Sequence, residues 1–430
     1  MSLGLLLFLG FFLLLLIGTP IAVAIAIPSF LVIWIGELGT PVIAPNFFAG
    51  IAKFPLLAIP LFILAGFILE RCGISQRVIS FANLLVGHRR GGLAIVAISV
   101  CVFFGGVSGS GPADAAAIGA ILIPAMYAQG YGKGYSAALI AAAGSTAIIV
   151  PPSIALIVYG AITNTSIPAL FAAGAIPGLL AGISLLVPAV WVARKKGYGA
   201  NVATTETEQE SFGKSFREAF WGLLAPVIIL GGWRGGIFTP TEAAVVAVFY
   251  SLFLGVVVYR TLNFKDLYQI LADANQTTAI VMLIIAFAGL FSWAGSTIGI
   301  LDMLANSLIG ASDNSWVILL LINLLIFIAG MLMDAISVFY IFLPIFIPIM
   351  HHFGWDPVWF GVVMTLNLAI GQFTPPVAVN LYVTTQLADI RLEDTFRAVI
   401  PMVIAMLIAL LIVILFPALS LYIPRFFGLM

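Results

Sequence analysis

Residues 104–114 read FGGVSGSGPAD, a run rich in glycine, serine and proline between two apolar segments. A distant counterpart, GQFTPP at residues 371–376, interrupts a second apolar region. Glycine and proline both disfavour continuous helix, and non-helical backbone leaves amide and carbonyl groups without partners. Within a bilayer such groups are tolerated only where protein or a water-filled cavity receives them. The two interruptions are therefore candidate binding sites in a membrane protein.

The composition places the chain in a class before any motif is considered. It has 430 residues, of which 63% are hydrophobic and 8% charged, and a soluble domain of this size does not carry so few charges. We therefore expect an all-α polytopic membrane protein. The formal net charge is zero, which indicates no basic surface for nucleic acid. The two cysteines, Cys72 and Cys101, predict neither a disulfide nor a metal framework.

The first half of the chain reads as a series of apolar segments with two interruptions. Two short apolar segments flank the glycine-rich run at 104–114, which favours a re-entrant helical hairpin over two full crossings. Pro151 and Pro152 interrupt a later segment and must break its helix. In chain order the expected elements are spans at 3–17, 20–36 and 46–69, an amphipathic arm at 71–90, the hairpin at 92–127, a broken span at 135–163 and a span at 168–193.

The same pattern begins again after a polar segment at 194–217. Three proline positions recur at a constant offset of 224 residues: Pro124 and Pro348, Pro152 and Pro376, and Pro177 and Pro401. Matches on proline at a constant offset indicate internal duplication. We expect a first repeat at 1–193, a linker at 194–217 and a second repeat at 218–430, each with its own hairpin and broken helix. The second hairpin is expected at 316–350.

Lysine and arginine positions predict the orientation in the membrane. The first apolar run lacks the marks of a signal peptide, so we expect a retained span. With five crossings and one hairpin in each repeat, fourteen of the seventeen basic residues fall in the cytoplasm, and Lys53, Arg234 and Arg425 fall outside. Both termini are then periplasmic, the linker is cytoplasmic, and the repeats are inverted. Merging the first two spans would make the repeats parallel, but it would place the arm and the basic residues at 194–196 on opposite faces.

In the inverted arrangement the hairpins enter from opposite faces, and their tips meet the proline breaks near the midplane. Half-helix N-termini there favour an anion, whereas unwound carbonyls and helix C-termini favour a hard cation such as Na⁺. An anion and a cation bound side by side are typical of a cation-coupled organic-anion symporter. No lysine or arginine is expected near the midplane, so the residues do not identify one particular acid.

Four motifs in order carry a resemblance to a known family: GGVSGSGPADAAAIG at 105–119, VPPS at 150–153, FTPTEA at 238–243 and QFTPP at 372–376. Together they resemble the large membrane subunit of tripartite ATP-independent periplasmic (TRAP) transporters, over nearly the whole chain. The resemblance implies a Na⁺-driven importer of the elevator type in the bacterial inner membrane. It also implies a small four-helix membrane subunit, a periplasmic substrate-binding protein, and carboxylate substrates such as C4-dicarboxylates or sialic acids.

The resemblance further implies two Na⁺ sites, each between a hairpin tip and a proline break, with ligands that are mostly backbone carbonyls. The residues implied for the first site are Ser108, Ser110, Ala147, Val150 and Pro152. Family members often have glycine where Ala147 stands. The residues implied for the second site are Met333, Gly371, Thr374 and Pro376. Polar side chains near the tips and breaks are candidates for substrate contact: Asp334, Asn367, Asn380 and Ser153.

Several polar residues also have a structural interpretation. Asp114 stands in the first turn of an expected helix, where a carboxylate caps free amides, and we favour this role over proton carriage. Glu242 lies at capping-box spacing. Asp334 is a functional candidate because it is ionisable and lies at a hairpin tip, but it could also cap the next helix. Asn367 and Asn380 could contact substrate or bond neighbouring helices.

An enzyme and a passive channel fit the sequence less well than a symporter. Ser108 lies in a GxSG pattern resembling that of rhomboid intramembrane proteases, which need a histidine base within the membrane. The histidines, His88, His351 and His352, all fall at expected helix ends, so we expect no enzyme. A passive channel needs a continuous polar lining, which no expected span shows. The remaining alternative is a stand-alone divalent-anion/sodium symporter, which needs no binding protein.

Overall fold

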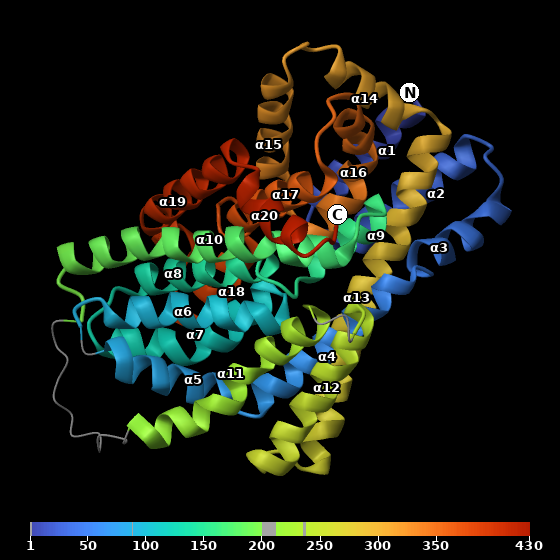
Figure 1. Ribbon diagram of the computed structural model, residues 1–430. Helices are drawn as coiled ribbons and strands as arrows, with labels where there is room; N and C mark the ends of the chain where they lie inside the picture. The colour runs from blue at the N-terminus through green and yellow to red at the C-terminus, as the bar shows by residue number, and fades with distance from the viewer. Residues whose placement is uncertain (1, 88, 200–211, 235–237) are drawn as a thin grey trace.

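The computed structural model describes residues 2–87, 89–199, 212–234 and 238–430. Throughout these ranges the chain forms helices and short connections, without a strand (Figure 1). The helices of the first half are α1 (Leu3–Leu16), α2 (Ile21–Ile35), α3 (Ile43–Ile51), α4 (Ala58–Arg71), α5 (Ile74–Ala82), α6 (Gly92–Ser108), α7 (Gly111–Ala128), α8 (Lys133–Ser145), α9 (Ile154–Thr163) and α10 (Ile167–Lys195).

The second half begins with α11 and ends close to the C-terminus. Its helices are α11 (Phe212–Arg234), α12 (Pro240–Phe253), α13 (Phe264–Thr297), α14 (Ile300–Ile309), α15 (Ser315–Leu332), α16 (Ala335–His352), α17 (Pro357–Gly371), α18 (Val379–Ala388), α19 (Phe396–Leu415) and α20 (Ala418–Phe426). The predicted linker at 194–217 overlaps the ends of α10 and α11, and residues 200–211 lie outside the described residues. The division of the chain into 1–193, 194–217 and 218–430 stays a prediction.

The helix bounds follow the predicted repeat closely. Adding 224 to the bounds of α7 gives those of α16, and adding 224 to the first residue of α8 gives that of α17. The first hairpin consists of α6 and α7, and the second of α15 and α16. The broken helices are α8 with α9 and α17 with α18, and the Pro151-Pro152 and Pro375-Pro376 bonds at the breaks are both cis. The prediction of an all-α membrane protein with inverted repeats, two hairpins and two broken helices is confirmed.

The third predicted span, 46–69, differs from its counterpart in the second half. In the described ranges, eight helices are long and apolar enough to cross a membrane, and α13, at 34 residues, is the longest of them. The corresponding part of the first half is divided at Ala52 and Lys53 into α3, a 3₁₀ turn (Phe54–Leu57) and α4. Pro55 stands in the first turn after the division, where its ring prevents the preceding helix from continuing. No proline occurs within α13.

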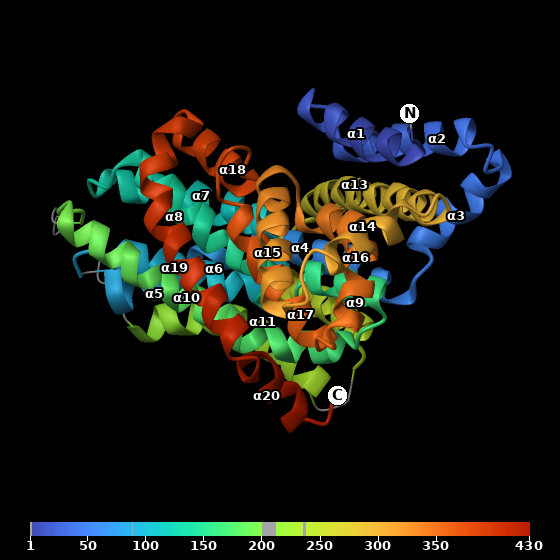
Figure 2. The same ribbon diagram turned by 90° about the horizontal axis from the view of Figure 1, so that it is seen from above.

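The helices pack in two groups that are visible in Figures 1 and 2. In one group α13 packs against α2, α3 and α4, and α12 packs against α4. In the other, α6, α7 and α8 pack together beneath α10, as Figure 1 shows. The two halves interleave in this second group, because α18 packs against α7 and α8 while α9 packs against α16 and α17. We call α2, α3, α4, α12 and α13 the scaffold. We call the two hairpins and the two broken helices, α6–α9 and α15–α18, the core unit.

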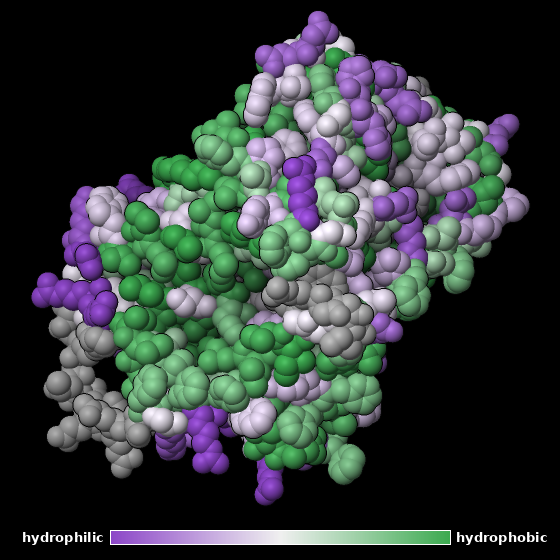
Figure 3. Space-filling model, viewed as in Figure 1, coloured by the Kyte–Doolittle hydropathy of each residue, from purple (hydrophilic) through white to green (hydrophobic). Residues whose placement is uncertain are grey.

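The surface carries the apolar side chains that a lipid environment requires. Figure 3 shows a broad apolar area between hydrophilic residues at the left and lower edges and others at the top. Large hydrophobic side chains are exposed along α10, such as Val187 at 72% and Ile183 at 59%. Such exposure is costly in water but favourable against lipid.

Candidate functional site

The tip of the first hairpin is closed by hydrogen bonds within the tip itself. Gly109 joins α6 to α7 with φ +61°, a conformation that glycine adopts without strain. The Ser108 hydroxyl donates to Asp114 Oδ1 at 2.6 Å and accepts from the Ser110 amide at 3.2 Å. Asp114 therefore ties the first turn of α7 back to the end of α6 through the Ser108 hydroxyl. Among the described residues no backbone amide donates to Asp114, so the amide cap predicted for it is not seen.

The same tip lies directly against the first break. A Cβ atom on Gly105 would lie 2.7 Å from Ala147 Cα, and one on Gly109 would lie 2.8 Å from the Pro152 carbonyl oxygen. Real Cβ contacts are longer, so glycine at these positions permits the close approach of the backbones. The structure thus brings the five residues implied for the first Na⁺ site together: Ser108, Ser110, Ala147, Val150 and Pro152.

Ser153 caps the helix that follows the first break. α8 ends at Ser145, a 3₁₀ turn covers Thr146–Ile148, and α9 begins after Ser153. The Ser153 hydroxyl accepts from the Leu156 amide at 3.2 Å and donates to the Ile148 carbonyl. Ser153 is buried. Through these two bonds its hydroxyl joins the turn that follows α8 to the first turn of α9.

The tip of the second hairpin is capped by Asp334. Its Oδ1 accepts from the amides of Ile336 at 2.9 Å and Ser337 at 3.0 Å, and its Oδ2 accepts from the Ser337 hydroxyl at 2.7 Å. This is the geometry of a helix N-cap. Met333, the residue before it, is extended and fully buried.

The second hairpin touches the second break through its backbone. A Cβ atom on Gly371 would lie 2.6 Å from the carbonyl carbon of Gly330, and the Ala378 amide donates to the Met331 carbonyl at 3.0 Å. Thr374 donates from its hydroxyl to the Ile370 carbonyl at 2.6 Å. The end of α15 thus lies against the second break through Gly330 and through Met331, two residues before Met333. Of the residues implied for the second Na⁺ site, Met333 and Gly371 are buried, as is Thr374, whereas Pro376 is exposed.

Asn367 and Asn380 each bond a neighbouring helix. Asn367 Nδ2 donates to the backbone and side-chain oxygens of Asn323 on α15, at 2.9 and 2.8 Å. Asn380 Nδ2 donates to the Ala141 carbonyl on α8 at 3.3 Å, which is a contact between the two halves of the chain. The helix-to-helix interpretation of these asparagines is thus seen directly, and contact with substrate stays a prediction.

Gln372 also lies beside the first hairpin, although the sequence alone did not single out its side chain. A Cβ atom on Gly111 would lie 2.5 Å from Gln372 Oε1 and 3.0 Å from Asn380 Nδ2. The first residue of α7 therefore meets the second break, so the first hairpin touches both breaks. The signal in the sequence was the position of Gln372 inside the motif at 371–376.

Four buried side-chain oxygens of this region have no hydrogen-bond partner among the described residues: Asp114 Oδ2, Asn367 Oδ1, Gln372 Oε1 and Asn380 Oδ1. A buried acceptor without a donor costs ~1–3 kcal/mol. Such oxygens suit a small occupant that brings positive charge or hydrogen-bond donors. Together with the helix ends at both breaks, they give the region the means to bind a cation beside an anion.

These features define a class of protein. Inverted repeats whose hairpins and broken helices meet inside the membrane are the construction of a membrane transporter. The chain belongs to the DctM component family of tripartite ATP-independent periplasmic transporters, whose profile matches residues 8–419.

Similar proteins from several bacteria agree with this membership. The chain is 40% identical to the sialic acid TRAP transporter large permease protein SiaM of Vibrio cholerae, over 89% of each chain. It is 41% identical to the C4-dicarboxylate TRAP transporter large permease protein DctM of Pseudomonas aeruginosa, over 87% of each chain. The isethionate TRAP transporter permease protein DctMQ of Oleidesulfovibrio alaskensis is 40% identical over 97% of this chain, which spans 65% of that relative's length.

A solved structure shares the fold. The YdaH transporter of Alcanivorax borkumensis, whose crystal structure reveals an unusual topology, superposes with a TM-score of 0.62 at 16% identity. The superposition covers 89% of this chain and 87% of the YdaH chain. At that identity the likeness concerns the fold alone.

Proposed function

We propose that this chain is the membrane permease of a Na⁺-coupled importer of organic acids. The observation that carries the proposal is the meeting of the first hairpin tip with both breaks, through Gly109 at Pro152 and Gly111 at Gln372. This arrangement gathers ends of several half-helices, so positive and negative dipole ends lie close together. An acid and a cation bound there would stabilise one another.

Na⁺ would be held by oxygens of the tips and breaks. A hard cation prefers carbonyl, hydroxyl and carboxylate oxygens, which these segments supply. The proposed ligands of the first site are Ser108, Ser110, Ala147, Val150 and Pro152. Those of the second site are Met333, Gly371, Thr374 and Pro376.

The substrate would be a carboxylate or a related organic acid. Relatives of this chain carry names for sialic acid, C4-dicarboxylate and isethionate transport, and all three substrates are organic anions. Asp334, Asn367, Asn380 and Ser153 remain the candidates for contact. Asp334 and Ser153 already cap helices, so they would act chiefly by fixing the helix ends that face the acid. Asn380 keeps a free acceptor oxygen beside the first hairpin.

Transport would proceed by an elevator movement of the core unit against the scaffold. By its definition the core unit contains both hairpins and both breaks, and it meets the scaffold where α16 packs against α13. The tip of the first hairpin lies beside α4 of the scaffold, where a Cβ atom on Gly66 would lie 3.7 Å from Ser108 Cα. Lys53 Nζ, at the division between α3 and α4, donates to the Ala161 carbonyl in α9 at 2.8 Å. Movement of the core unit would break this bond.

The proposed setting is the bacterial inner membrane, with both termini periplasmic and the segment 194–217 cytoplasmic. The partners would be a small four-helix membrane subunit and a periplasmic binding protein that delivers the acid. The stand-alone symporter remains the second candidate, because its architecture would be similar. An intramembrane protease gains no support from the site, since Ser108 donates to Asp114 and His352 ends α16 far from the tip of its hairpin.

Uptake into liposomes tests the proposal. The chain is reconstituted with the two partner proteins, and uptake of a labelled acid is measured with and without an inward Na⁺ gradient. We expect accumulation only with the gradient and only with the binding protein. Equal uptake in both conditions would refute Na⁺ coupling, whereas gradient-driven uptake without the binding protein would favour the stand-alone symporter.

A further inference from the structure

Exposed apolar side chains form a stripe along α10 that ends in basic residues. Leu179, Ile183, Val187 and Trp191 are all exposed. Residues four apart are neighbours on a helix surface, and because each such step turns about 40°, the stripe winds around α10. The next position in this series is Lys195, which is also exposed. A hollow of about 550 Å³ lies at this end of the stripe, lined by Val187, Val190, Trp191, Arg194 and Lys195.

Other cations gather around the same end of α10. Arg89 and Arg90 stand in the turn before α6, and this turn touches α10, because a Cβ atom on Gly91 would lie 3.3 Å from Ala193 Cβ. Lys133 begins α8, whose Tyr135 hydroxyl donates to the Ala189 carbonyl of α10. The basic residues of this cluster are Arg89, Arg90, Lys133, Arg194, Lys195 and Lys196. In Figure 3 hydrophilic residues accordingly gather at the left edge, where α10 ends in Figure 1.

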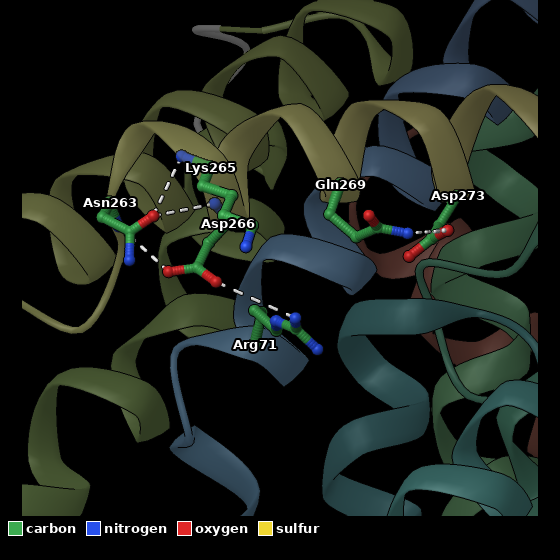
Figure 4. A network of polar contacts seen from close by, with 6 residues as sticks. All are labelled: Arg71, Asn263, Lys265, Asp266, Gln269 and Asp273. Atoms are coloured by element: carbon green, nitrogen blue, oxygen red, sulfur yellow. Dashed lines mark hydrogen bonds and ion pairs between the residues drawn. The ribbon is translucent and has the colours of Figure 1, made fainter.

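These charges are not neutralised by carboxylates in the described part of the chain. The ion pair found there joins Arg71 to Asp266 at 3.8 Å, in the polar network around the start of α13 that Figure 4 shows. The basic cluster instead makes contacts with aromatic rings. Lys195 Nζ lies 4.9 Å from the centre of the Trp191 ring. Tryptophan and basic residues together are typical of the boundary between lipid tails and headgroups.

We propose that this end of α10 binds one anionic phospholipid. Arg194 and Lys195 would bind the phosphate, since guanidinium and ammonium groups form charge-assisted bonds with it. One acyl chain would lie along the stripe. From Lys195 to Ile183 the helix rises about 18 Å, close to the ~15 Å half-thickness of the hydrocarbon core. A free phosphate would use the cations but not the apolar stripe, so the stripe points to a lipid.

Lipid binding to the purified chain tests the assignment. Native mass spectrometry is used with phosphatidylglycerol, phosphatidylcholine and inorganic phosphate as the probes. We expect saturable binding of phosphatidylglycerol that neither of the other probes displaces. The double variant Arg194→Gln/Lys195→Gln should bind it at least about tenfold more weakly, because each basic residue contributes to the attraction. A matched double variant, Lys265→Gln/Arg425→Gln, removes two charges elsewhere and should bind as the unaltered chain does.

Three outcomes would overturn the proposal. They are equal binding of phosphatidylcholine, displacement by inorganic phosphate, and unchanged binding by the Arg194 and Lys195 variant. A second measurement uses the unaltered chain, in case that variant does not fold. A photoactivatable phosphatidylglycerol should cross-link to the peptide that contains residues 183–195, and cross-linking confined to other helices would contradict the assignment.

Discussion

Gly109 is the residue where a single methyl group should matter most. It has φ +61°, and a Cβ there would meet the Pro152 carbonyl at 2.8 Å. We expect Gly109→Ala to push the hairpin tip away from the first break and to lower Na⁺-driven uptake at least about tenfold, because small displacements at a binding site are costly. Uptake in liposomes over a range of Na⁺ concentrations measures this effect.

Gly130 offers the matched control for that substitution. It also has a positive φ, +82°, but nothing lies within 4 Å of the Cβ that alanine would add. Gly130→Ala therefore introduces the same type of backbone strain, about 1 kcal/mol, without the clash. Equal loss of uptake in the two variants would mean that the close approach at Pro152 has no role.

Substitutions of Asp114 distinguish a structural role of this residue from proton carriage. In Asp114→Asn the side-chain oxygen can still accept from the Ser108 hydroxyl, so we expect most Na⁺-driven uptake to remain. Asp114→Ala leaves that hydroxyl without its acceptor and should lower stability by ~1–3 kcal/mol. Thermal unfolding and uptake measured on both variants check this. Loss of uptake in a stably folded Asp114→Asn would instead indicate that the carboxylate carries a proton or binds the ion.

Some of these residues could be found in the sequence and others could not. The glycine and serine tip and the proline breaks stand out because they interrupt apolar helices, and their effect on the backbone is local. The contact between Gly111 and Gln372 was not predictable, because it depends on how the two halves of the chain dock. Asp334 could be selected as an ionisable residue at a tip, but its bonds to Ile336 and Ser337 required coordinates.

At the scale of helices, the repeat was the strongest signal in the sequence. Proline matches at an offset of 224 residues predicted the pairing of α7 with α16, whose bounds agree to the residue. The division between α3 and α4 was missed, because the apolar character of residues 46–69 continues across Lys53. Pro55 was the local signal for it, as proline cannot continue the preceding helix.

The bond from Lys53 to Ala161 gives a test of movement between helices. With Cys72 and Cys101 replaced by alanine, the variant Lys53→Cys/Ala161→Cys would carry one thiol in the scaffold and one in α9. We expect a short bifunctional thiol cross-linker to abolish uptake, because α9 could no longer move against the scaffold. Uptake of a labelled acid before and after cross-linking is the measurement.

The control pair joins α12 of the scaffold to α11, which packs against it. Tyr250 in α12 donates from its hydroxyl to the Trp221 carbonyl in α11 at 2.6 Å. Cross-linking Trp221→Cys/Tyr250→Cys should leave uptake intact, since these helices would move together. If both cross-linked variants transport normally, the core unit does not move against the scaffold as proposed.

For the whole molecule, membership of the DctM component family places the chain among transporter permeases. The class of protein could be predicted from the sequence, because composition and broken helices decide it. The particular acid could not, since the site offers amides, hydroxyls and helix ends that would serve many carboxylates. Relatives of similar identity carry names for different acids.

Coupled flux of Na⁺ and the acid is the most direct test of the proposal that this chain belongs to a Na⁺-coupled importer. Entry of ²²Na⁺ into liposomes containing the permease and its small partner is measured after adding binding protein, either empty or loaded with its acid. We expect the loaded binding protein to increase Na⁺ entry in proportion to the acid taken up. Entry of the acid with no change in Na⁺ entry would contradict the proposal.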